Sequence, residues 1–345
     1  MKKLPFLLLA LILSACAAPS VTETAPESAR ISLPTAAALT PFPAPAALSP
    51  TAAPTQGFPT FTPPTAQPGK PIEIRFPPNG TYLDLPDSIP AGGSKTYALN
   101  AMKGQIMSVS VLPQADAAGS IAMQIKGADG GVLCPKSADE QCLFWRDALP
   151  ASQNYFITLA SDGGGMQYVM RVAINPLNVE FQYFEFKSDM GFSLTYPDAF
   201  APAPPVPGNY KTQPVLTLQL IETALYEKTN LSEVYLMFSA SADPQVAAAC
   251  AEPNQNGGGG PEYPVGEEVY NGINYVHTAT EGAGAGNLYR QEIYRAVNGD
   301  TCYEIIYYIH STNIGNYPPE ANVTEFNLDA VLQYLQAALS TLEIQ

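Results

Sequence analysis

The stretch that decides the fold is residues 287–312, which read NLYRQEIYRAVNGDTCYEIIYYIHST. Two runs rich in Tyr, Ile and Val, residue types that favour β-strands, flank Asn298-Gly299. Both turn residues tolerate positive φ, so the pair predicts a two-residue type I′ hairpin between two long strands. The register that follows places Tyr294 opposite Tyr303.

Further strand-like runs precede this hairpin, and an amphipathic segment follows it. The runs cover residues 215–221, 234–240 and 272–280. From Leu328 to Leu342 apolar residues recur at helical spacing, and Asn327 is a suitable N-cap. An antiparallel sheet covered by a terminal helix predicts an α+β domain for residues 176–345.

A short motif near the start of this domain adds a resemblance. Residues 189–197 read DMGFSLTYP, and Gly-Phe-x-x-x-Tyr-Pro marks the entry strand of PsbP-like domains. The segment, the long sheet and the closing helix therefore resemble that family. The resemblance implies a fold and no activity.

Residues 71–175 show shorter alternating runs separated by Gly, Asp, Asn and Pro. The runs cover residues 96–99, 105–112, 121–125, 154–160 and 166–174. Turn signals are frequent and no helical stripe occurs, which predicts an antiparallel β-sandwich of jelly-roll type. The run GADGG at residues 127–131 is a natural hairpin tip. The chain is thus expected to be mainly β, a sandwich followed by an α+β domain.

Four motifs in this segment occur in the order typical of bacterial pre-peptidase C-terminal domains. They are KTYAL at 95–99, KGQ at 103–105, GADG at 127–130 and LPASQNYFI at 149–157. The segment resembles that family and, in the same region, periplasmic inhibitors of goose-type lysozyme. The motifs are turns and core positions, so the resemblance implies a β-sandwich and is silent on activity.

The N-terminus carries an export signal. Residues 1–16 read MKKLPFLLLALILSAC, with two lysines before an apolar core of about ten residues. The segment Leu13-Ser14-Ala15-Cys16 resembles the lipobox of bacterial lipoproteins, which implies lipidation of Cys16 and cleavage before it. Acyl chains bind membranes by about 0.8 kcal/mol per buried methylene. We therefore expect an extracytoplasmic, membrane-anchored protein, on the inner membrane, the outer membrane or a Gram-positive surface.

Residues 17–70 are predicted to be a disordered linker. They contain 12 prolines among mostly Ala, Thr and Ser, and only four charged residues. Such a composition buries too little apolar surface to offset the entropy of ordering the chain. The segment is typical of a tether between a membrane anchor and a folded head.

The charge of the chain is negative and unevenly distributed. It has 31 acidic and 16 basic residues, a net charge of −15, and residues 176–345 alone hold 20 acidic and 5 basic residues. The clustered Lys and Arg of a nucleic-acid-binding protein are missing. The chain also lacks the uninterrupted apolar runs of about 18 residues that a polytopic membrane protein needs.

Four cysteines remain when Cys16 is assigned to lipid. An even number in an exported protein predicts disulfides, and the domain division selects Cys134–Cys142 and Cys250–Cys302. A zinc site is the alternative, but the sequence has no C-x-x-C motif and no histidine near these cysteines.

The search for catalytic and cofactor motifs yields no candidate. The two histidines, His277 and His310, are expected on opposite faces of the sheet, with His277 near Arg290. No nucleophile elbow, HExxH helix or phosphate-binding loop occurs, and no acidic loop has calcium-site spacing. We therefore expect no enzymatic activity, no cofactor and no metal site.

Tyrosines are abundant in the last domain. Core and cross-strand packing is the simpler interpretation, but exposed tyrosines are typical of recognition surfaces. The candidate ligand-binding residues are Tyr275, Tyr289, Tyr307 and Tyr308. The expected function is non-enzymatic binding of a protein, a glycan or a cell-wall polymer. The alternatives are inhibition of a cationic lysozyme-type enzyme, or service as the accessory module of a secreted hydrolase.

Overall fold

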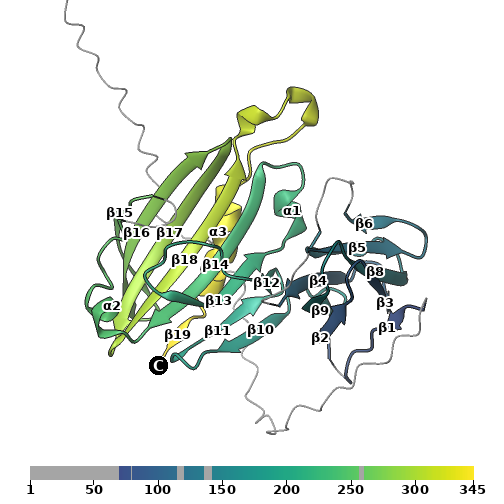
Figure 1. Cartoon of the computed structure of the whole chain (residues 1–345), viewed down its shortest axis with the longest axis horizontal. Coiled ribbons are helices and arrows are strands. Elements are labelled where there is room, and N and C mark those ends of the chain that lie inside the picture. The colour runs from purple at the N-terminus through teal and green to yellow at the C-terminus, as the bar shows by residue number, and fades with distance from the viewer. Residues whose placement is uncertain (1–69, 79, 115–119, 136–141, 256–259) are drawn as a thin grey trace, which may run out of the picture. The chain divides into compact units, whose positions relative to one another are not determined.

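The computed structural model describes residues 70–78, 80–114, 120–135, 142–255 and 260–345 (Figure 1). The predicted signal segment, Cys16 and the linker at 17–70 lie outside this range, apart from Lys70. No helix in the described ranges is long and apolar enough to cross a membrane.

Residues 72–174 form two antiparallel sheets, as the alternation predicted. The five-stranded sheet has the order β1 (Ile72–Glu73), β3 (Ser94–Ala101), β8 (Gln153–Ser161), β5 (Ile121–Gly127) and β6 (Val132–Cys134). The four-stranded sheet has the order β2 (Tyr82–Ile89), β9 (Met166–Ile174), β4 (Ile106–Pro113) and β7 (Phe144–Ala148). Among the described strand pairs of these two sheets, only the short β1–β3 pair is parallel. One apolar core joins side chains of both sheets, which is the packing of a β-sandwich.

Residues 176–345 are built on an antiparallel seven-stranded sheet. Its order is β12 (Phe200–Pro202), β13 (Gln213–Leu220), β14 (Leu231–Ser241), β18 (Thr301–Thr312), β17 (Asn287–Asn298), β16 (Ile273–Gly284) and β15 (Tyr263–Tyr270). A second sheet holds β10 (Tyr183–Lys187), β11 (Phe192–Pro197) and β19 (Glu343–Ile344). The helices are α1 (Thr223–Tyr226), α2 (Pro244–Ala248) and α3 (Leu328–Leu339), with 3₁₀ turns at Ile314–Asn316 and Pro319–Ala321. The α+β expectation is confirmed.

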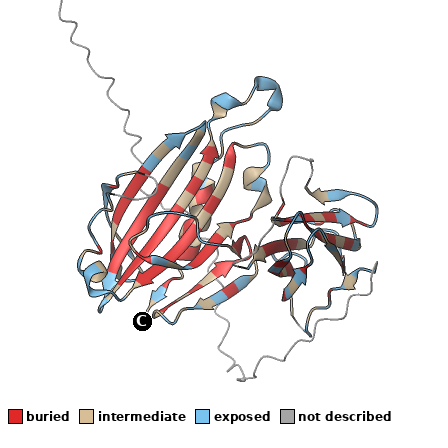
Figure 2. Ribbon diagram, in the orientation of Figure 1, coloured by how far each residue is buried: buried red, intermediate tan, exposed pale blue. Residues whose placement is uncertain are grey.

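The closing helix α3 defines one face of the seven-stranded sheet. It begins after Asn327, whose side chain accepts a hydrogen bond from the Ala330 amide as predicted. Its residues Val331 and Leu335 are fully buried in the same core as Tyr307 of β18. We call this side of the sheet the helix face and the other side the outer face. Figure 2 shows that the middle strands are mostly buried, whereas the edge strand β15 is mostly exposed.

The two long hairpins have registers that differ from the predicted ones. Asn298 pairs with Thr301, so Tyr294 lies opposite Ile305 and not Tyr303. The loop is Gly299-Asp300, in which Gly299 alone has positive φ (+59°), so the second turn residue needs no left-handed conformation. The shift is two residues, and every side chain therefore keeps its predicted face.

The second hairpin turns at Ala285-Gly286, where both residues have positive φ (+51° and +82°). This is the type I′ requirement, and it lets β16 continue past Thr280 to Gly284. His277 therefore lies opposite Tyr294, and the predicted proximity to Arg290 is wrong because Arg290 pairs with Glu281.

Candidate functional site

The four candidate tyrosines divide between the two faces of the sheet. Tyr275 and Tyr307 are 1% and 0% exposed and belong to the core that α3 completes. Their selection as ligand contacts is therefore corrected: they point to the helix face, where protein covers them. Tyr289 and Tyr308 point to the outer face and are half-buried. Only these two remain candidates for contact with a ligand.

Three neighbouring strands bring a row of rings together on the outer face. Tyr235 of β14 pairs with Tyr308 of β18, and their ring centroids lie 6.0 Å apart. Tyr289 of β17 follows at 6.4 Å from Tyr308. We call Tyr235, Tyr308 and Tyr289 the tyrosine row. In the described part of the chain none of the three hydroxyls makes a hydrogen bond, so each is available to a ligand.

His310 fixes the end of the row. Its ring is stacked on Tyr289 with centroids 4.6 Å apart and an interplanar angle of 14°. Its Nε2 lies 3.1 Å from Asn287 Oδ1, and its Nδ1 lies 3.4 Å from Glu233 Oε2. The imidazole thus holds the Tyr289 ring in one plane.

His277 lies on the helix face, so the prediction that the two histidines occupy opposite faces is confirmed.

A hollow of about 330 Å³ adjoins the row. Its lining residues are Pro207, Gly282, Ala283, Gly284, Tyr289, Gln291 and Tyr308. None of these side chains is charged, although the surrounding domain is strongly acidic. The volume is at the lower end of the ~300–1,000 Å³ range of small-ligand sites, and aromatic lining with few polar groups is typical of such sites.

Two polar groups of the hollow, the Gln291 amide and the Tyr308 hydroxyl, can form hydrogen bonds with a ligand. Gln291 is 6% exposed, and within the described ranges its amide makes no hydrogen bond. Burial, together with the charge of Glu233, raises the pKa of Tyr308 to about 12. The Tyr308 hydroxyl therefore stays protonated at neutral pH and can donate a hydrogen bond.

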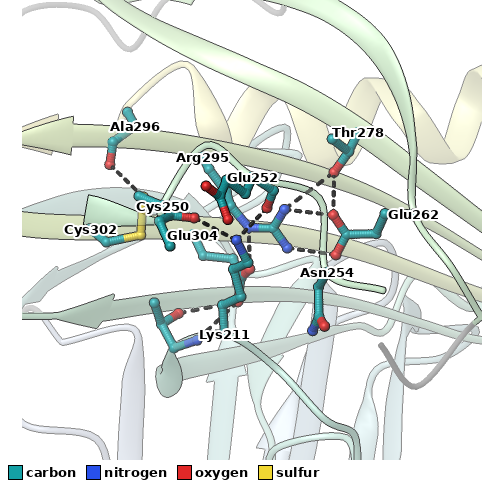
Figure 3. A network of polar contacts seen from close by, with 12 residues as sticks. Lys211, Cys250, Glu252, Asn254, Glu262, Thr278, Arg295, Ala296, Cys302 and Glu304 are labelled. Carbon is teal, nitrogen blue, oxygen red and sulfur yellow. Dashed lines mark hydrogen bonds and ion pairs between the residues drawn. A yellow bond between two sulfur atoms is a disulfide. The ribbon is translucent and has the colours of Figure 1, made fainter. Parts of the chain in front are cut away.

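The other half of the outer face is closed by a buried ion network (Figure 3). The guanidinium of Arg295 makes two 2.6 Å bonds to Glu262 and donates from Nε to Glu304 at 2.6 Å. Thr278 donates to Glu262 at 2.8 Å. Burial opposes the ionisation of Glu262, but the hydrogen bonds and charge of Arg295 outweigh it and lower the pKa of Glu262. The bidentate geometry and satisfied oxygens indicate a structural network.

Lys211 and a disulfide complete this closed region. Lys211 donates to the backbone oxygen of Ala249 at 2.6 Å and also to that of Glu252. The Cys250–Cys302 disulfide lies beside the network (Figure 3). Both predicted disulfides are present, since Cys134 is bonded to Cys142. All four sulfurs are thereby bonded to sulfur, which excludes a zinc thiolate site at these cysteines.

A second ionic cluster lies on the helix face. His277 Nδ1 is 2.8 Å from Glu268 Oε1, and His277 Nε2 is 2.8 Å from Glu292 Oε2. Burial opposes protonation, but hydrogen bonds to the two carboxylates outweigh it and raise the pKa of His277 to about 9. The ring is therefore an imidazolium at neutral pH, with both nitrogens occupied as donors. Such a ring has no free lone pair with which to accept a proton from a substrate.

Sequence reasoning missed Gln291 and both ionic clusters. Arg295 and Glu304 lie directly opposite each other in the β17–β18 ladder. The predicted register was two residues away from this pairing and concealed it. For Gln291 the available signal was its position two residues after Tyr289, on the same face of one strand.

The described residues contain no group of three or more His, Cys, Asp or Glu side chains arranged to hold a metal ion.

Comparison with known proteins adds little. No family model matches the chain, and no curated protein sequence matches it. The chain is similar to solved structures of PliG, a periplasmic inhibitor of g-type lysozyme.

Three PliG structures illustrate the similarity. The Aeromonas hydrophila protein is 19% identical, with 30% of this chain and 95% of that chain covered and a TM-score of 0.23. The Salmonella Typhimurium protein and an Escherichia coli mutant are each 20% identical to this chain. In both cases 31% of this chain and 99% of the other chain are covered, with a TM-score of 0.24. Similarity at this level supports no inference about function.

Proposed function

We propose that this protein is a non-enzymatic, lipid-anchored extracytoplasmic binding protein whose ligand lies on the tyrosine row. The observation that carries the proposal is the row itself: half-buried rings with unengaged hydroxyls beside an uncharged hollow. A folded sheet usually covers such rings or pairs their hydroxyls when they serve packing alone.

The chemistry of the row suits recognition. Each tyrosine offers a flat apolar surface and a polar tip, and its ring has few rotatable bonds to immobilise on binding. The strands β14, β17 and β18 hold the rings on a rigid scaffold, with His310 stacked behind Tyr289. A ligand therefore meets a preformed surface, which lowers the entropic cost of association.

The location outside the cytoplasm rests on two independent features. Two disulfides are typical of proteins that fold in an oxidising compartment. The lipobox-like segment ending at Cys16 supplies the anchor, and the Pro-rich linker supplies the distance between membrane and ligand-binding domain.

The acidic charge of residues 176–345 favours a second candidate, inhibition of a cationic lysozyme-type enzyme. Complementary charge accelerates association with a basic partner and makes it salt-dependent. In that case the partner contacts acidic surface, and binding weakens with added salt but does not depend on the tyrosine row.

The test is retention of the full chain, kept in mild detergent, on envelope fragments that contain membrane and cell wall. Tyr308→Ala is compared with Tyr263→Ala, since Tyr263 is 44% exposed in β15 of the same sheet. We expect Tyr308→Ala to reduce retention severalfold and Tyr263→Ala to leave it unchanged. Equal retention of wild type and Tyr308→Ala contradicts the proposal.

The two candidates are separated by a second measurement with purified goose-type lysozyme. Salt-sensitive loss of lysozyme activity that persists in Tyr308→Ala supports the inhibitor. Unchanged lysozyme activity at low salt removes that candidate.

A further inference from the structure

We propose that the hollow beside the tyrosine row binds one pyranose ring of a neutral oligosaccharide. The inference rests on the proposed function and specifies the chemical class of its ligand. Three features carry it: the uncharged lining, two rings set at an angle, and an amide in the lining that has no partner in the described part of the chain.

The uncharged lining selects a neutral ligand. In a domain with 20 acidic and 5 basic residues, the seven lining residues carry no ionisable group except the two tyrosine hydroxyls. An anion meets no cation in the hollow, and a cation finds no carboxylate to compensate its desolvation. The volume of about 330 Å³ suits a single ring better than a folded polypeptide surface.

The two rings form two walls of the hollow. The planes of Tyr289 and Tyr308 meet at 48°, with centroids 6.4 Å apart. A pyranose presents apolar C–H groups on its faces and hydroxyls around its edge. One tyrosine ring can therefore pack against a sugar face while both phenol groups exchange hydrogen bonds with hydroxyls.

Gln291 supplies the directional contact. It lies on the same face as both rings: it follows Tyr289 by two residues in β17 and pairs with Tyr308 of β18. The residue is 6% exposed, and its amide makes no hydrogen bond in the described part of the chain. Its oxygen and nitrogen are not among the fully buried unpaired atoms, so the amide is open to a ligand at the hollow that it lines. A sugar hydroxyl, which donates and accepts, matches an amide that does both.

The strand end at Gly282–Gly284 leaves the hollow open. A Cβ added at Gly284 meets no atom within 4 Å, and Gly284 lacks the positive φ that would strain a substitution. Gly284 lies opposite Asn287, on the face that carries Tyr289. A larger side chain at position 284 is therefore expected to fold normally and to enter the hollow.

The experiment titrates the full chain, in mild detergent, with cellotetraose and chitotetraose by isothermal calorimetry at low and high salt. We expect saturable binding of at least one oligosaccharide that does not change with salt, because no charge is involved. Gln291→Leu is expected to weaken binding about tenfold, as for one lost hydrogen bond. Gly284→Leu is expected to abolish binding, and Tyr263→Ala to leave it unchanged.

Each outcome decides one question. Failure of both oligosaccharides to bind, or equal affinity of Gly284→Leu and wild type, overturns the saccharide site. If envelope retention still depends on Tyr308 in that case, the binding face stands and only its ligand class is wrong. If retention does not depend on Tyr308 either, the proposed function fails with it.

Discussion

The two faces of the seven-stranded sheet carry the same residue types in opposite circumstances. Tyr307 and Tyr308 are neighbours in β18, yet Tyr307 is fully buried on the helix face and Tyr308 is half-buried on the outer face. Likewise His277 is clamped by two carboxylates on the helix face, whereas His310 stacks on Tyr289 on the outer face.

The difference is caused by what covers each face. Helix α3 packs its apolar side against the helix face and completes one core. On the outer face, salt bridges from Arg295 to Glu262 and Glu304 close one half. The small buried cluster of Met237, Ile293 and Ile306 lies on the same face, and Tyr308 of the half-buried tyrosine row packs against it. Alternation within a strand thus assigns a side chain to a face, but it does not decide whether that face is a core or a surface.

The largest expected effect compares the buried ion network of the outer face with the Arg290–Glu292 ion pair on the helix face. Arg295→Met leaves Glu262 and Glu304 buried without a counter-charge, and we expect it to lower the free energy of unfolding by about 5 kcal/mol. Arg290→Met, at a residue that is 21% exposed, is expected to cost about 1 kcal/mol. Urea denaturation at pH 7 measures both.

The pH dependence gives the Arg295 prediction a control. In the wild type the lowered pKa of Glu262 stabilises the fold at pH values above 4.5, the ordinary pKa of a glutamate. This stabilisation is lost as the pH falls through the lower pKa of the folded state. In Arg295→Met the unpaired carboxylate is relieved by protonation. The difference in the free energy of unfolding between wild type and Arg295→Met should therefore become smaller below about pH 4.5. A gap that widens in acid contradicts the ion-network account.

The next effect compares adjacent tyrosines. Tyr307→Ala empties a fully buried site and is expected to cost about 4 kcal/mol, whereas Tyr308→Ala is expected to cost about 1 kcal/mol. Thermal or urea unfolding of the two variants checks the contrast. Equal losses would mean that the outer face is as tightly packed as the helix face.

A smaller effect concerns the two histidines. The raised pKa of His277 stabilises the fold fully below pH 6.5, and that contribution is lost as the pH rises toward about 9. The side chain of Glu268 is 37% exposed, and solvent weakens its interaction with His277. The free energy of unfolding is therefore expected to fall by about 2 kcal/mol over this pH range, less than the full pKa shift implies. His277→Gln should abolish this pH dependence and His310→Gln should retain it. A pH dependence that follows His310 refutes the assignment.

Much of the architecture was predictable from the sequence because it is encoded locally. Period-two alternation located the main strands of both domains. Asn327 and the apolar stripe located α3, and the even number of cysteines, divided between two domains, predicted both disulfides. Only short or exposed elements such as β2 and β15 were missed. Pro86 and Pro264 interrupt their alternation.

The candidate site was less predictable, because it depends on register and on contacts between distant segments. A two-residue shift in the β17–β18 hairpin decides whether Arg295 faces Glu304, and the turn at Ala285-Gly286 decides whether His277 reaches Glu292. Whether Tyr307 or Tyr308 faces solvent depends on where α3 packs. That contact is absent from any local pattern, so two of the four selected tyrosines were core residues.

The central claim is that the tyrosine row touches the ligand, and tyrosine footprinting tests it most directly. The full chain is oxidised with hydroxyl radicals in the presence and absence of envelope fragments, and modification is read at individual tyrosines by mass spectrometry. The account predicts that Tyr289 and Tyr308 are protected by the fragments while the 44%-exposed Tyr263 is modified equally in both samples. Unchanged modification of Tyr289 and Tyr308, or protection confined to Tyr263, contradicts it.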